Sequence, residues 1–165
     1  MLKKPKLKHI IFLFVISILL FITMSSNAFG LLENTGFNSN MMLDKKIFYT
    51  SQDMSNLISS LSNEMIKTYF SLHLIDYIFI IFFYPFLRLL LIYVGRRKSK
   101  FIIIPLFAMV FDIIENIIID ISLSHVLPNI LMTISGVITL FKFICIFVSI
   151  ILIIYYSITI KKNIK

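Results

Sequence analysis

Four long runs of apolar residues, separated by polar or basic stretches, dominate the pattern along the chain. The runs cover about residues 9–29, 72–94, 101–123 and 130–160. A helix needs about 20 predominantly apolar residues to cross the hydrocarbon core of a bilayer, and each run supplies roughly that number or more. We therefore predict an all-α fold. It is a bundle of four transmembrane helices that forms a single integral membrane domain over residues 1–165.

The polar stretch 30–71, between the first two runs, contains its own helical pattern. Thr50 with Asp53 three residues later resembles a capping box, in which Asp replaces the usual Glu or Gln. Apolar residues then recur at helical spacing, namely Met54, Leu57, Ile58, Leu61, Met65 and Tyr69. We predict an external amphipathic helix between helices 1 and 2 that covers the apolar ends of the membrane helices.

The first run also fits a second interpretation. Its basic start and the sequence Ser26-Asn27-Ala28 are typical of a secretory signal with a small-residue cleavage site. The strongly apolar part, 10–24, is short for a span, and residues 25–29 complete the required length. We expect a retained helix, whereas cleavage would leave three helices and an external amino terminus.

Composition and charge support the membrane assignment. Apolar residues make up 59% of the 165 residues and the mean hydropathy is +0.96, more than a water-soluble domain of this size carries. The net charge is +8. The basic residues gather before the first run, between the second and third, and after the fourth, as the positive-inside rule requires. We therefore expect a multi-pass protein with both termini in the cytoplasm, membrane lipids as contacts of its basic residues, and no nucleic-acid partner.

Six ionisable residues fall inside or at the edges of the apolar runs: Asp76, Arg88, Asp112, Glu115, Asp120 and Lys142. An isolated charge at the bilayer centre costs about 2.5–3.5 kcal/mol, so these groups should pair or face water. At about 1.5 Å per residue, Asp112 lies about 16 Å from the inner end of its helix and Lys142 about 18 Å from the outer end of its own. These levels nearly coincide across a core of about 30 Å. We predict that Asp112 and Lys142 form a pair.

The other ionisable groups lie nearer the two surfaces. Arg88 is closer to the inner side, where its long side chain can extend to the headgroups. Asp76 and Asp120 are near the outer surface, where we expect interfacial carboxylates.

One stripe of the third run concentrates polar groups. Asp112, Glu115 and Asn116 are spaced i, i+3 and i+4, so they project from one helix face among Phe and Ile residues. This stripe is either an ion-pair and hydrogen-bond staple that holds the bundle together, or a pocket for a cation, a proton or a ligand headgroup. The predicted polar core, or ligand site, comprises Asp112, Glu115, Asn116, Lys142, Arg88 and Asp76.

Small residues and prolines bear on helix packing. Ser135, Gly136 and Thr139 give the fourth run a small face that favours close helix contact. Pro105 lies in the first turn of the third span, where proline is tolerated, and Pro85 lies in the interior of the second.

The sequence predicts no metal site and no cofactor. His9, His73 and His125 lie at the ends of the predicted helices without a partner at metal-ligand spacing, so we expect interfacial side chains. The single cysteine, Cys145, excludes an intrachain disulfide and a Cys-x-x-Cys centre. No Gly-rich phosphate loop or nucleophile elbow is present. Enzymatic activity stays open, and the sequence identifies no catalytic residue.

Short motifs follow one another in an order that resembles a known family. Tyr49-Thr50 opens the amphipathic helix and Asp76 begins the second span, followed by Phe111-Asp112-x-x-Glu115-Asn116 and then Thr139-x-x-Lys142. This order, which covers most of the chain, resembles a family of small bacterial four-helix membrane proteins of uncharacterised function. It implies a bacterial cell membrane. The chain departs from the family pattern in the second span, where position 80 is Ile80 rather than proline. The layout is also similar, more weakly, to the sterol-isomerase and sigma-2-receptor-like membrane fold.

Three functions remain open from the sequence. We expect a partner or accessory subunit, which acts with another membrane protein or as a homo-oligomer. The alternatives are the binding or isomerisation of a lipid-like ligand, with a carboxylate as acid or base, and the transport of protons or cations. A closely packed core around Asp112 would favour the accessory subunit. An enclosed apolar cavity there would favour the lipid-like ligand, and a water-filled path would favour transport.

Overall fold

Helices form every regular element in the part of the chain that the structure describes. The computed structural model describes residues 5–33, 43, 46–95, 100–125 and 127–162. The elements are α1 (Leu7–Glu33), α2 (Ser51–Ser60), α3 (Asn63–Val94), the short 3-10 helix η3 (Lys100–Ile103), α4 (Ile104–Ser124) and α5 (Asn129–Lys162). The helices α1, α3 and α5, and η3 together with α4, contain segments long and apolar enough to cross a membrane. The predicted all-α bundle is confirmed.

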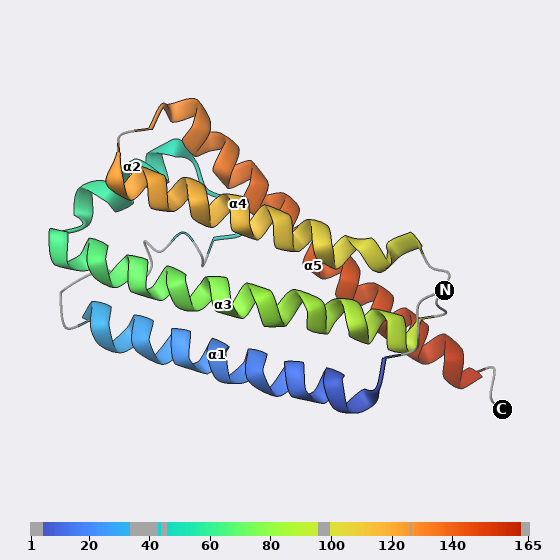
Figure 1. Ribbon diagram of the computed structural model, residues 1–165. Coiled ribbons are helices and arrows are strands. Elements are labelled where there is room, and N and C mark those ends of the chain that lie inside the picture. The colour runs from blue at the N-terminus through green and yellow to red at the C-terminus, as the bar shows by residue number, and fades with distance from the viewer. Residues whose placement is uncertain (1–4, 34–42, 44–45, 96–99, 126, 163–165) are drawn as a thin grey trace.

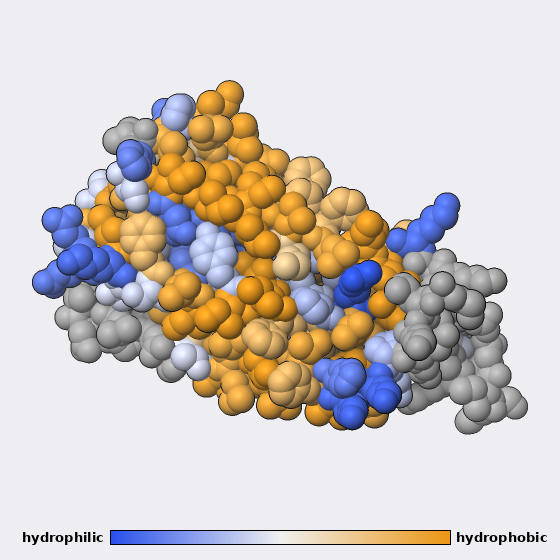
Figure 2. Space-filling view, in the orientation of Figure 1, coloured by the Kyte–Doolittle hydropathy of each residue, from blue (hydrophilic) through white to orange (hydrophobic). Residues whose placement is uncertain are grey.

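The long helices run side by side in alternating directions (Figure 1). The start of α1 and the end of α5 lie at one end of the bundle, which also holds the exposed cations Lys8 and Lys100, and we call it the basic end. The helix α2 lies at the opposite end of the bundle, which we call the α2 end. Hydrophobic side chains dominate the flank between the two ends (Figure 2), as lipid contact requires.

The segment between the first two spans differs from the prediction. A new helix begins at Asn63, because the Ser62 Oγ accepts a hydrogen bond from the Met65 amide at 3.3 Å and caps the start of α3. The prediction of one amphipathic helix that extends to Tyr69 is therefore wrong, since Met65 and Tyr69 belong to α3. The helix α1 also extends to Glu33. Residues 34–42 and the basic connection 96–99 lie outside the described residues.

The capping box at the start of α2 is confirmed. The Thr50 Oγ1 accepts from the Asp53 amide at 3.2 Å, and the Asp53 Oδ2 accepts from the Thr50 amide at 2.8 Å. A hydrogen bond from the Lys46 Nζ, at 2.5 Å, lowers the pKa of the Asp53 carboxyl to about 2. The carboxylate is therefore charged at the helix N-terminus, where negative charge is favourable.

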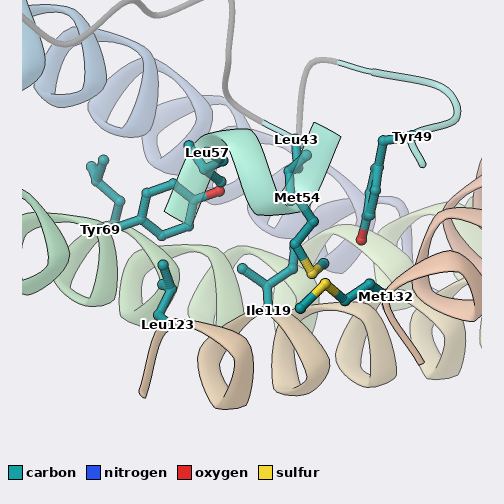
Figure 3. Close-up of a cluster of buried hydrophobic side chains, with 9 residues drawn as sticks. Leu43, Tyr49, Met54, Leu57, Tyr69, Ile119, Leu123 and Met132 are labelled. Atoms are coloured by element: carbon teal, nitrogen blue, oxygen red, sulfur yellow. The ribbon is translucent and has the colours of Figure 1, made fainter. Parts of the chain in front are cut away.

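A cap segment, residues 46–60, closes the α2 end of the bundle. Its buried side chains meet those of α4 and α5, and Figure 3 shows Met54 pointing from α2 toward Ile119 and Met132. Tyr49 and Leu57 are also fully buried in this cluster. The apolar face of the cap segment therefore packs against the helix ends, as the sequence predicts.

The small face of α5 is buried, and one of its residues makes an unexpected contact. Ser135 and Thr139 are fully buried between helices. At Gly136, however, an added Cβ would lie 1.8 Å from the Tyr49 carbonyl oxygen. The close approach at Gly136 is thus made by the backbone of the cap segment rather than by another membrane helix.

This contact predicts the effect of Gly136→Ala. Because the obstacle is backbone, the cap segment must move, and we expect a loss of about 1–3 kcal/mol in the free energy of unfolding, the usual cost of overpacking. Thermal unfolding in detergent measures the loss, and Val137→Ala, at a neighbouring exposed position, is the control. Equal stability of Gly136→Ala and wild type would contradict the contact.

Candidate functional site

A buried ion-pair cluster joins α4 to α5 in the middle of the bundle. The Lys142 Nζ lies 3.0 Å from the Asp112 Oδ1 and 2.5 Å from the Glu115 Oε2. Lys142, Asp112 and Glu115 are 7%, 6% and 0% exposed. The predicted pair of Asp112 and Lys142 is confirmed, but the lysine also binds Glu115. We call these three residues the central clasp.

Two hydroxyl groups complete the coordination of the clasp carboxylates. The Tyr84 hydroxyl donates to the Asp112 Oδ2 at 2.6 Å. The Thr139 Oγ1 donates to the Glu115 Oε1 at 2.6 Å. Every carboxylate oxygen of the clasp therefore has a partner inside the bundle, which is what a buried charge needs in a medium without water.

Tyr84 was not among the predicted core residues, although its spacing contains a signal. His73, Tyr77 and Tyr84 are separated by four and seven residues, which places them on one face of α3. The same spacing also fits an aromatic packing stripe, so it identifies the hydrogen-bonding role only when the facing carboxylates of α4 are known.

Two smaller polar groups lie between the clasp and the α2 end. The Asn116 Nδ2 donates to the Asp76 Oδ2 at 2.5 Å. The Asp120 carboxylate contacts the His73 Nδ1 at 2.6 Å and accepts from the Tyr77 hydroxyl at 2.9 Å. Both groups join α3 to α4, so the bundle is fastened at successive turns.

These contacts bear on three expectations from the sequence. His73 is buried rather than interfacial, because α3 begins at Asn63 and places it well inside the helix. Asp76 and Asp120 are half-buried, and each is bonded to side chains of the facing helix, contacts that the sequence did not predict. The start of α3 at Asn63 was the missing information for His73 and Asp76. Asp120 lies on α4, and its partners are the side chains of the facing α3.

Arg88 stands apart from the other predicted core residues. Its Nε is buried without a hydrogen-bond partner among the described residues. Arg88 also takes no part in the ion pairs found in the described part of the chain. The structure thus joins Asp112, Glu115 and Lys142 directly, joins Asp76 to Asn116, and leaves Arg88 outside both groups.

Ser135 lies between the cap segment and the clasp and makes a hydrogen bond on each side. The Tyr49 hydroxyl lies 2.6 Å from the Ser135 Oγ. One turn along α5, the Thr139 Oγ1 is 3.0 Å from the Ser135 carbonyl oxygen and 2.6 Å from Glu115. Because a hydroxyl has one proton, these two acceptors compete for Thr139. Ser135 thus contacts the cap segment through its side chain and Thr139 through its backbone carbonyl.

A cavity of about 240 Å³ lies between α1 and α3, away from the clasp. Its lining consists of Ser17 and apolar side chains: Phe14, Ile18, Phe21, Phe79, Phe83 and Phe86. The rings of Phe14 and Phe86 are 5.2 Å apart, which shows how α1 packs on α3. None of the predicted polar-core residues lines this cavity, so it brings no carboxylate against a ligand.

The arrangement limits the chemistry of the clasp. When both carboxyl groups are ionised, two negative charges face one ammonium group, and one added proton makes the cluster neutral. Within the described residues, no group of three His, Cys, Asp or Glu side chains is placed to bind a metal ion.

Comparisons with known proteins give no relative for this chain. No protein-family model, no curated protein and no solved structure matches it.

Proposed function

We propose that this multi-pass membrane protein is an accessory subunit of another membrane protein. One observation carries the proposal: both oxygens of Asp112 and of Glu115 are occupied by groups of the same chain. A catalytic carboxylate needs a free position within hydrogen-bond reach of its substrate. A saturated clasp instead fixes the relative position of three helices, as a scaffold requires.

The surroundings of the clasp favour this function over proton transport. A transport path needs polar groups on both sides of the clasp. Toward the α2 end such groups are present, whereas toward the basic end Leu87, Leu91 and Ala108 are buried and apolar. The buried Ser149 hydroxyl on that side donates within its own helix, to the Cys145 carbonyl oxygen. A proton that reached the clasp from the α2 end would meet this apolar layer.

Photo-crosslinking in the native membrane tests the accessory role. A photoreactive residue at lipid-facing positions, such as Ile78, Ile117 and Ile151, should yield a discrete crosslink to one other membrane polypeptide from one face of the bundle. The buried position Ile80 is the control and should yield none. Crosslinks to lipid alone from all faces, or only to a second copy of this chain, would contradict the proposal.

We further propose that both termini face the cytoplasm, because of the distribution of basic residues. The proposal of a bacterial cell membrane rests on the family resemblance of the motif order. Cysteines introduced at the exposed positions Gln52 and Lys100, in a Cys145→Ala background, test this orientation. In intact cells an impermeant thiol reagent should label position 52 and spare position 100. The reverse labelling would overturn the orientation.

A further inference from the structure

Arg88 is a cation in the membrane region with no partner in the described part of the chain. Its Nε is buried without a hydrogen bond, while the side chain as a whole is only half-buried. A guanidinium group has five donors and remains charged at all physiological pH values. A charge of this kind in an apolar setting requires an anionic partner, and that partner must come from outside the described residues.

The depth of Arg88 identifies the kind of partner. It lies six residues before Val94, the last residue of α3, so its Cα is about 9 Å from the end of the helix. An extended arginine side chain covers much of that distance and places its guanidinium near the headgroup layer. Figure 2 shows a hydrophilic patch on the apolar flank where α3 and α4 adjoin, toward the basic end.

Charge at the same end favours a lipid as the partner. Lys6, Lys8 and Lys100 lie at the basic end, and they attract anionic headgroups to the surrounding leaflet. The planar guanidinium fork matches two oxygens of a phosphate group. We propose that Arg88 binds the phosphate of an anionic phospholipid in the leaflet at the basic end, with the acyl chains along α3 and α4.

Native mass spectrometry of the full-length protein, titrated with dioleoylphosphatidylglycerol or dioleoylphosphatidylcholine, tests the site. Wild type should retain phosphatidylglycerol in preference to phosphatidylcholine. Arg88→Gln should bind phosphatidylglycerol about tenfold more weakly, and Arg88→Lys, which keeps the charge and loses the fork, should fall between them. The control Lys8→Gln removes an exposed cation at the same end and should have a much smaller effect.

A second readout separates lipid binding from a structural role. Because Arg88 has no partner among the described residues, Arg88→Gln should match the wild-type melting temperature in phosphatidylcholine and lose the increase that phosphatidylglycerol gives wild type. Equal loss of stability in both lipids, or unchanged binding of phosphatidylglycerol by Arg88→Gln, would overturn the proposal. Equal stabilisation by inorganic phosphate would assign the site to a free anion. A photoreactive residue at position 88 that crosslinks to another polypeptide, with loss of bound phosphatidylglycerol, would assign the site to a carboxylate of a partner helix. Either of these two results would overturn the lipid assignment.

Discussion

The ammonium group of Lys142 is the constraint on which the rest of the bundle depends. A buried lysine on a membrane helix must have an anion within contact distance, and α4 presents two, Asp112 and Glu115. This requirement fixes the rotation and the depth of α5 against α4. Tyr84 then fixes α3 to the same point through Asp112. Apolar contacts alone would allow these helices to slide, because lipid competes equally for their surfaces.

The same constraint extends to the α2 end. Glu115 binds Thr139, which lies one turn from Ser135, and Ser135 contacts the Tyr49 hydroxyl of the cap segment. Gly136 lets the Tyr49 backbone approach α5 closely. The cap segment is thus seated by a polar contact and a steric fit as well as by the apolar face of α2. In contrast, α1 packs on α3 through aromatic contacts and leaves an apolar cavity between the two helices. Because these contacts do not involve the clasp residues, α1 is the helix that depends least on the clasp.

Hydrophobic pattern alone predicted the number of spans, because a bilayer imposes its length on each helix. The membrane depths of Asp112 and Lys142, estimated from the helical rise per residue, also predicted that these two residues pair. They could not show that Glu115 shares the lysine, since spacing along α4 places both carboxylates on one face without saying which of them α5 meets. The start of α3 at Asn63 was missed because Met65 and Tyr69 fit an amphipathic pattern as well as a span. That error in helix start placed His73 at a helix end, whereas it lies inside α3 and is buried.

The central claim, that Lys142 fastens the bundle through two carboxylates, is tested most directly by thermal unfolding in detergent of a charge-removal series. Lys142→Met alone should cost about 3–5 kcal/mol, since it leaves the carboxylates without a cation. Adding Asp112→Asn and Glu115→Gln, which keep acceptors for Tyr84 and Thr139, should recover much of that loss. The exposed Lys100→Met is the control. If the triple variant is instead destabilised by the sum of its separate effects, the three residues are not coupled and the clasp does not hold the bundle together.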